Sequence, residues 1–263
     1  MIYLPILGAI IFSLSTIVEK KVVSRKNINI WVFVVAHFLA VVLVSVPFLY
    51  FFWNIESGAL TFYSLSIFGL IVILSLIANY FVVSSFKGDS INHLEPARAI
   101  EPLFVIIFAL VFSVFFGQEL YERNANIFIP ALIAGGALIF SHINKGHLSF
   151  NKYFLFAICG SLFFALEMVI TRLILDFYSP ISFYVLRCSA VALLTFIIFR
   201  PKFSEVDKNS FGLFFIIGAL LLGFRIIVYY GYVQLGVIFT TLLVMLGPVF
   251  VYIFAHFILK ERM

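Results

Sequence analysis

The chain has few charged residues for its length. Lys and Arg total 17 and Asp and Glu total 12 among 263 residues, so charged residues make up 11%, whereas a soluble domain carries about 25%. Hydrophobic residues make up 64% of the chain and mean hydropathy is +1.18. This composition excludes the water-soluble globular classes, and we expect lipid to be the solvent for most of the chain.

The sequence also lacks the motifs of common catalytic and metal sites. Its two cysteines, Cys159 and Cys188, each lie inside an apolar run, which predicts neither a disulfide framework nor a metal site. A glycine-rich phosphate loop, a His-Glu-x-x-His pair and a Cys-x-x-Cys motif are all absent from the sequence. The loops between apolar runs are too short to hold a catalytic domain. We therefore predict no enzymatic activity, no cofactor and no metal.

What the sequence does contain is a succession of apolar runs, each near the roughly 20 residues that a membrane-spanning helix requires. Their continuous apolar character excludes the alternating pattern of a membrane β-barrel. The chain is thus predicted to be an all-α integral membrane protein with nine spans. The predicted spans are Met1–Val18, Ile28–Trp53, Leu60–Phe86, Ser90–Phe116, Ala125–Phe140, Tyr153–Ile170, Ile181–Phe199, Phe211–Tyr232 and Val237–Leu259.

The basic residues, which give a net charge of +5, are scattered through the loops. They form no cluster on one element, so a nucleic-acid partner is not predicted. Loops after odd-numbered spans hold twelve basic residues, and loops after even-numbered spans hold only Arg123 and Arg172. Because Lys and Arg are retained on the cytoplasmic side, this tally by itself places the N-terminus outside.

The two halves of the chain share three short similarities in the same order. The matched segments are Gly8–Leu14 with Gly160–Leu166, Val35–Leu43 with Val185–Leu193, and Pro102–Glu119 with Pro248–Glu261. We therefore expect a repeat, with residues 1–150 as the first copy and residues 151–263 as the second. Because each copy has an odd number of helices, the copies insert in opposite orientations, as in many secondary transporters.

Two motifs carry a resemblance to a known family. The run from Ser179-Pro180 to Arg187 looks like the entry into the second helix of a repeat, and the run from Leu246-Gly247-Pro248 to Glu261 looks like a repeat ending. In these features the chain resembles EamA-type members of the drug/metabolite transporter superfamily. The resemblance implies a ten-helix bundle of two five-helix repeats, a small-molecule substrate, and a location in the bacterial cytoplasmic membrane.

The chain departs from this family pattern in several places. His37 stands in the first repeat where Arg187 stands in the second, and the proline-to-glutamate spacing is longer in the first repeat. The chain stops at Met263, where a helix matching Ala125–Phe140 would begin. We therefore expect nine helices, with the tenth missing. Family members have cytoplasmic termini, which conflicts with the charge tally, so the orientation stays open.

A stripe of ionisable residues lies in the span that begins at Ser90. Glu95, Arg98 and Glu101 are three residues apart, so they share one side of a helix. Glu101 lies about 15–17 Å along that helix at 1.5 Å per residue, and Pro102 removes a backbone donor there. We expect a substrate site with Arg98 and Glu101 and proton coupling through Glu101. The alternative is that Glu95 and Arg98 lie at the interface and Glu101 only pairs with Arg98.

Two further polar groups occupy matching places in the halves, Arg187 and His37. A guanidinium at this depth suits a substrate carboxylate or phosphate, and a histidine can carry a proton. We therefore assign Arg187 to substrate binding and His37 to proton coupling. The alternative for Arg187 is a structural role, in which it hydrogen-bonds the end of a neighbouring helix.

The remaining candidates lie in three predicted spans: Leu60–Phe86, Tyr153–Ile170 and Phe211–Tyr232. Glu167 is a candidate proton-coupling group, although a structural ion pair with Arg225 is the favoured reading. Substrate binding by side-chain hydrogen bonds and ring faces is the role expected for Asn79, Tyr229 and Tyr230.

Together these features predict a secondary transporter. It would move a small organic metabolite, such as an amino acid or a drug-like amphiphile, by proton-coupled alternating access. Membrane lipids and protons are the other expected partners. The alternative function is an intramembrane lipid-handling protein or enzyme that acts on a lipid headgroup, with a laterally open cleft lined by Arg98 and Arg187. A third reading is a membrane scaffold, whose buried charges would be fully paired.

Overall fold

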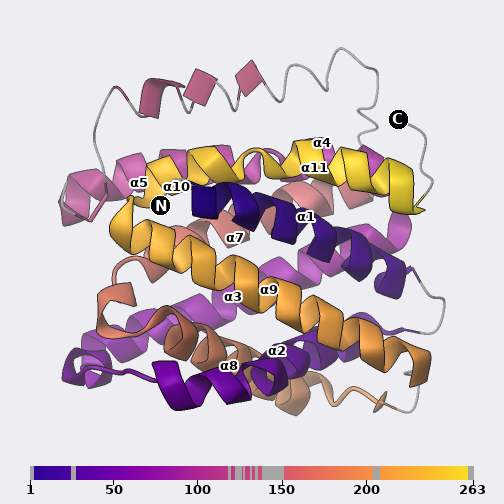
Figure 1. The fold of residues 1–263 in the computed structure, drawn as a ribbon, viewed down its shortest axis with the longest axis horizontal. Coiled ribbons are helices and arrows are strands. Elements are labelled where there is room, and N and C mark those ends of the chain that lie inside the picture. The colour runs from indigo at the N-terminus through magenta and orange to yellow at the C-terminus, as the bar shows by residue number, and fades with distance from the viewer. Residues whose placement is uncertain are drawn as a thin grey trace.

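The computed structural model is a bundle of long helices that lie side by side (Figure 1). It describes residues 3–24, 28–117, 120, 121, 126, 128–130, 132, 133, 136, 137, 151–203 and 208–259. Over these residues the backbone forms helices and a single isolated β-bridge, between Ile55 and Tyr178, with no strand. The prediction of an all-α protein is confirmed.

The helices of the first half precede residue 117. They are α1 (Tyr3–Val23), α2 (Ile30–Phe52), the short 3-10 helix η1 (Ser57–Leu60), α3 (Phe62–Gly88), α4 (Ile91–Arg98) and α5 (Glu101–Phe116). The helices of the second half follow residue 151. They are α7 (Lys152–Thr171), the 3-10 turn η2 (Leu175–Phe177), α8 (Pro180–Phe199), α9 (Lys208–Gln234), α10 (Val237–Val244), α11 (Gly247–Phe254) and the π-helical turn η4 (Ala255–Leu259).

Among the described residues, seven helical segments are long and apolar enough to cross a membrane. These seven correspond to the second, third, fourth, sixth, seventh, eighth and ninth predicted spans, with ends that differ by up to three residues. The predicted first span forms α1, which continues to Val23 and therefore includes the charged residues that follow Val18. The predicted span Ala125–Phe140 lies largely outside the described residues.

Two of these segments are broken in the middle, which the sequence predicted only at Pro102. The first break separates α4 from α5 at Ala99 and Ile100, and the second separates α10 from α11 at Met245 and Leu246. The local geometry is the same at both breaks: the N–H of Ile100 bonds the carbonyl three residues earlier at 3.4 Å, and so does the N–H of Leu246. A proline follows two residues later in each case, where its missing N–H cannot complete the helical pattern.

Helices from the first half pack mainly on helices from the second half (Figure 1). α1 lies along α9, and α3 lies along α7. The helix α2 packs on α8, and the broken segments meet each other through α5 with α10 and α4 with α11. The broken segments of the two halves therefore face each other.

Glycine allows the closest of these contacts. A Cβ added at Gly218 in α9 would lie 2.8 Å from the carbonyl carbon of Ala40 in α2, and one at Gly160 in α7 would lie 2.6 Å from Cγ2 of Val82 in α3. Small residues of this kind let membrane helices approach each other closely.

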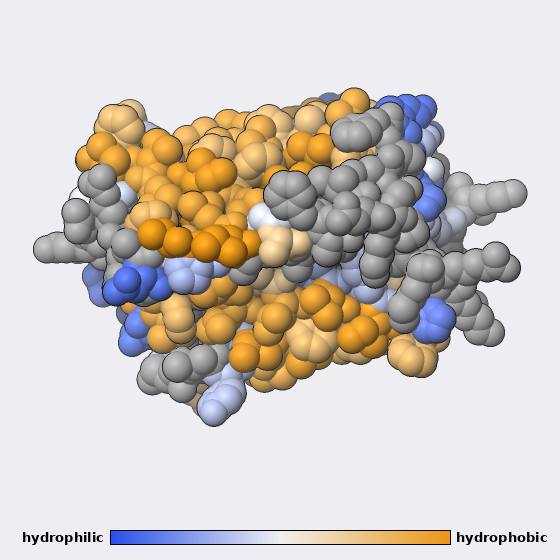
Figure 2. All heavy atoms as spheres, turned by 90° about the horizontal axis from the view of Figure 1, so that it is seen from above, coloured by the Kyte–Doolittle hydropathy of each residue, from blue (hydrophilic) through white to orange (hydrophobic). Residues whose placement is uncertain are grey.

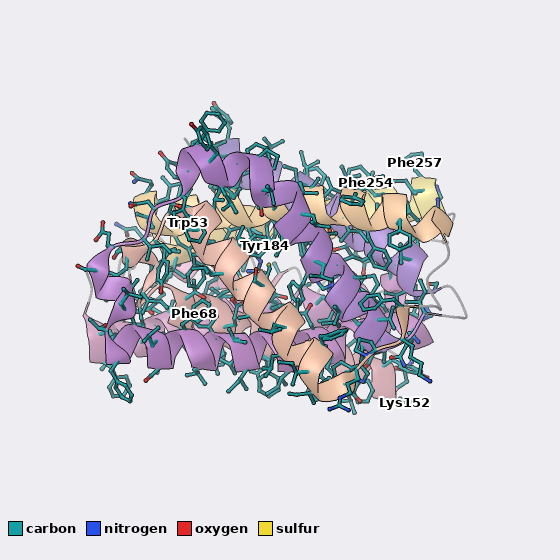
Figure 3. The ribbon with its side chains drawn as sticks, turned by 90° about the horizontal axis from the view of Figure 1, so that it is seen from below. Trp53, Phe68, Lys152, Tyr184, Phe254 and Phe257 are labelled. Atoms are coloured by element: carbon teal, nitrogen blue, oxygen red, sulfur yellow. The ribbon has the colours of Figure 1, made fainter. Side chains whose placement is uncertain are left out.

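Hydrophobic residues cover the middle of the face shown in Figure 2, and hydrophilic residues gather toward the two ends of the long axis. Trp53 and Lys152 lie toward opposite ends of the bundle (Figure 3). At the end with Trp53, the loop after α2 is joined to the loop after α7. The backbone N–H of Ser179 bonds the carbonyl of Asn54 at 3.0 Å, and the N–H of Asn54 bonds Oγ of Ser182 at 2.9 Å.

Candidate functional site

Two adjoining pockets lie between the halves in the middle of the bundle. The first, here named the apolar pocket, is lined by Phe12, Glu95, Arg98, Glu101, Pro102, Val105, Met168, Phe224, Val228, Tyr232, Thr241, Val244 and Pro248. The second, here named the polar pocket, is lined by Phe12, Glu19, His37, Phe38, Asn79, Val82, Val83, Arg98, Glu101, Phe164, Tyr184, Arg187, Leu221, Phe224 and Arg225. Because they share Phe12, Arg98, Glu101 and Phe224, we treat them as one site.

The break between α4 and α5 brings Glu101 to both pockets. Glu101 is the first residue of α5, and Pro102 follows at a position where a helix needs no backbone donor. Among the described residues, Glu101 forms no hydrogen bond and no ion pair. Its carboxyl group is therefore available to a ligand or a proton.

The second break supplies the opposite wall. Pro248 lines the apolar pocket, and the carbonyl of Gly247 accepts a hydrogen bond of 2.9 Å from Oγ of Ser13 in α1. A side chain from another helix thus satisfies a backbone carbonyl at the break, as is common where membrane helices are interrupted.

Arg98 lies between the two pockets and is 9% exposed. Its Nη1 atom is 3.7 Å from Oε2 of Glu95 and 3.4 Å from Oγ1 of Thr16. The guanidinium lies over the rings of Phe12 and Phe86, at 5.3 and 5.1 Å from their centroids. Glu95 is also buried, so the structure places both side chains inside the bundle.

A second charged cluster joins α7, α8 and α9. Glu167 is fully buried, and its Oε1 atom accepts a short hydrogen bond from Nη1 of Arg187. Its Oε2 atom is 3.8 Å from Nη2 of Arg225, so the pair expected from the sequence is present, with Arg187 as an additional partner. Nη1 of Arg187 also donates to the hydroxyl of Tyr229 at 2.9 Å.

Two other predicted site residues line the polar pocket. His37 is buried, with Nδ1 at 3.3 Å from the carbonyl of Phe33. Asn79 donates from Nδ2 to the carbonyl of Ser75 at 2.7 Å, which leaves its side-chain oxygen available to the pocket.

The two predicted tyrosines of α9 are placed differently. Tyr229 is buried and reaches the pocket only through Arg187. Tyr230 is 37% exposed and lines neither pocket. Consecutive helical residues point about 100° apart, so Tyr229 and Tyr230 face different directions. A role of Tyr230 in binding stays a prediction.

Sequence reasoning missed Glu19, Tyr184 and Tyr232. Glu19 was placed in a loop because it precedes Lys20 and Lys21, but α1 continues past it and its side chain lines the polar pocket. Oε1 of Glu19 accepts a hydrogen bond of 2.9 Å from Ser15, one helical turn earlier. A serine four residues before an acid inside an apolar run is the signal that could have identified it.

Tyr184 and Tyr232 were hidden among the many aromatic residues of the chain. Tyr184 lies near the middle of the bundle (Figure 3), with the guanidinium of Arg187 4.9 Å from its ring centroid. Tyr232 lines the apolar pocket. Tyr184 precedes Arg187 by three residues on the same helix, which is a spacing at which two side chains can contact each other.

The arrangement defines a class of protein: a helical integral membrane protein whose interior site combines carboxylates, guanidiniums and interrupted helices. Within the described residues, no group of three His, Cys, Asp or Glu side chains is placed to hold a metal ion. The comparison with protein families gives a more specific result. Residues 151–263 match the model of the EamA-like transporter family, which confirms the resemblance stated from the sequence. No curated protein matches the chain.

Proposed function

We propose that the protein is a secondary transporter that moves a small organic solute by alternating access of two inverted repeats, residues 1–150 and 151–263. The contacts between the halves support this arrangement. The first helix of each half packs on the third helix of the other, as α1 on α9 and α7 on α3. Each half also contributes one broken segment, with Pro102 and Pro248 at matched positions. Rocking of one repeat against the other about these breaks would expose the site to each side in turn.

Proton coupling through Glu101 is part of the proposal, and the observation that carries it is the free carboxyl group of Glu101 at a helix break. The charged groups around it are Glu19, Glu95, Arg98, Glu167, Arg187 and Arg225. A carboxylate that lines a cavity at membrane depth is typical of proton relays in transporters. Glu167 and His37 are further candidates for this role, but protonation of Glu167 would require its two ion pairs to break.

For substrate binding we propose Arg98, Glu101, Arg187 and Asn79, which all line the polar pocket. Tyr229 supports this group by holding Nη1 of Arg187.

Burial of the arginines favours a transporter over the two alternatives. A lipid-handling protein would present Arg98 and Arg187 at a laterally open cleft, whereas these side chains are 9% and 2% exposed. A scaffold would have its buried polar groups fully satisfied, whereas Nε of Arg98 and Nε of Arg187 have no hydrogen-bond partner among the described residues.

The test uses purified protein in two stages. A thermal-stability screen over amino acids, nucleosides, sugars and organic cations and anions identifies a ligand, because binding raises the melting temperature. Uptake of that ligand into proteoliposomes is then measured with and without a pH gradient. We expect Glu101→Gln to lose the uptake driven by the gradient. Glu56→Gln, which changes an exposed acid in a loop, is the matched control and keeps it. Full gradient-driven uptake by Glu101→Gln would refute the coupling role.

A further inference from the structure

Three arginines from three different helices line the polar pocket. Arg98 comes from α4, Arg187 from α8 and Arg225 from α9. Their exposed fractions are 9%, 2% and 7%, so each guanidinium is almost entirely removed from the surrounding medium. Buried arginines at membrane depth are rare and normally paired, so three around one pocket need an explanation.

Each of these arginines has a buried nitrogen without a partner. With the residues that the structure describes, Nε of Arg98, Nε of Arg187 and Nη1 of Arg225 form no hydrogen bond. A guanidinium carries five N–H donors in a planar fork, and a buried donor left unpaired is costly. An oxygen-rich anion in the pocket could satisfy them, because carboxylate and phosphate oxygens match this fork.

Two of the three arginines share one carboxylate, because Glu167 contacts both Arg187 and Arg225. Glu167 does not itself line the polar pocket, so it pairs with Arg187 and Arg225 without occupying the space of a ligand. Of the pocket-lining acids, Glu19 accepts a bond from Ser15, and Glu101 lies on the side shared with the apolar pocket.

The adjoining pocket indicates the rest of the ligand. Apart from its polar residues, the apolar pocket is lined by side chains such as Met168, Val228 and Val244. An apolar group placed there would be continuous with a head group in the polar pocket, because Phe12 and Phe224 line both.

We propose that Arg98, Arg187 and Arg225 form an oxyanion subsite, and that the transported solute is an organic anion with a carboxylate or phosphate group and an apolar body. This inference rests on the proposed transport function. It gives Arg225 a role in substrate specificity, beyond its pairing with Glu167. Glu167 then acts as a positioning residue that holds two of the three guanidiniums.

The experiment measures binding, separately from transport. Purified protein in detergent is titrated with three probes that share a phenyl ring: 3-phenylpropionate, phenyl phosphate and 2-phenylethylamine. We expect a saturable rise in melting temperature with at least one of the two anions and none with the amine. The stronger anion identifies the head group as carboxylate or phosphate. A rise with the amine alone, or with no probe, would overturn the subsite.

Variants assign the binding to the arginines. Arg225→Met is expected to weaken the binding of the preferred anion at least tenfold. Arg225→Lys keeps a charge opposite Glu167 but loses the fork, and we expect a smaller loss. The matched control is Arg172→Met, which removes a buried arginine that pairs with Asp176 and lines neither pocket. Wild-type affinity in both Arg225 variants, or an equal loss in the control, would contradict the proposal.

The two proposals fail in different ways. If the anions bind in an Arg225-dependent manner but are not taken up by proteoliposomes, the transport function is wrong and the subsite stands. If gradient-driven uptake depends on Glu101 but is unaffected by the Arg225 variants, the subsite is wrong and the transport function stands.

Discussion

Arg187 in α8 donates a hydrogen bond from Nη1 to Oε1 of Glu167 in α7, and this pair joins two helices at the centre of the second half. Both side chains are buried, so neither charge has solvent to replace its partner. The pair therefore both links α7 to α8 and holds the guanidinium of Arg187 in place at the site.

Removing one member of this pair should destabilise the protein. We expect Arg187→Met to lower the free energy of unfolding by about 3–5 kcal/mol, because it leaves a buried carboxylate short of a partner. Denaturant unfolding in detergent micelles measures the effect. Glu167 also pairs with Arg225, so the triple variant Glu167→Gln, Arg187→Met, Arg225→Met is needed to remove all three charges of the cluster. It should lose less stability than the sum of the three single variants, and a strictly additive loss would contradict an origin in these ion pairs.

Helix packing at Gly218 should tolerate no added methyl group. We expect Gly218→Ala to destabilise the protein by about 1–3 kcal/mol, because the new Cβ would overlap the backbone of α2 at Ala40. Gly69→Ala in α3 is the control, since a Cβ there meets nothing within 4 Å. Thermal unfolding of the two variants side by side makes the comparison. Equal melting temperatures would show that α2 and α9 can separate at no cost.

The pH dependence of stability should include a contribution from Asp89, which lies between α3 and α4. Partial burial by itself raises the pKa of the Asp89 carboxyl, but hydrogen bonds from Asn151, from the backbone of Ser90 and from His93 outweigh it and hold the pKa below its ordinary value. The distance from Nδ2 of Asn151 to Oδ2 of Asp89 is 2.7 Å.

Because the folded pKa is lowered, the stabilisation is fully present above the unfolded pKa of about 3.9 and is lost as pH falls through the folded value. We expect the wild type to melt above Asp89→Asn at pH 5 to 7, and the difference to shrink below about pH 4. Melting temperatures across this range test it. A difference that grows on acidification would have the wrong sign.

Glu101 should oppose anion binding through its own charge. If the oxyanion subsite is correct, Glu101→Gln should bind the preferred phenyl anion more tightly, on the order of tenfold, since about 1.4 kcal/mol of repulsion is removed. The same variant is expected to lose gradient-driven uptake, so binding and transport should change in opposite directions. Titration of the thermal shift at fixed pH gives the affinity. Weaker anion binding in this variant would contradict a repulsive effect of Glu101 on the ligand.

Much of the fold could be predicted from local sequence. Long apolar runs predicted the membrane helices, since a segment that lies in lipid must satisfy its backbone internally. Pro102 indicated a weakened helix beside Glu101, and the structure shows the break two residues earlier. The run from Ser179 to Arg187 was enough to indicate the family that residues 151–263 match.

Other features were beyond local reasoning. Glu19 was missed because its neighbours Lys20 and Lys21 suggested a loop, although the helix continues to Val23. The adjoining residues Tyr229 and Tyr230 could not be told apart from the sequence, whereas in the structure Tyr229 is buried and Tyr230 is 37% exposed. The first case depends on where a helix ends, and the second on how a helix is rotated about its axis. The hydropathy of this chain is too uniform to predict either property.

The sequence by itself determined that the chain is a helical membrane protein and which few ionisable residues lie inside its spans, because solvation in lipid depends on composition and length. Only the tertiary structure decided which of those charges meet. Glu167 pairs with Arg187 across two helices, and Arg98 and Arg225 line the same pocket. Within the part of the chain that the structure describes, Glu101 has no hydrogen-bond or ion-pair partner. These relationships depend on how closely the helices approach each other and how each helix is rotated. Contacts between helices, such as that of Gly218 with Ala40, determine both, and the sequence of a single helix does not.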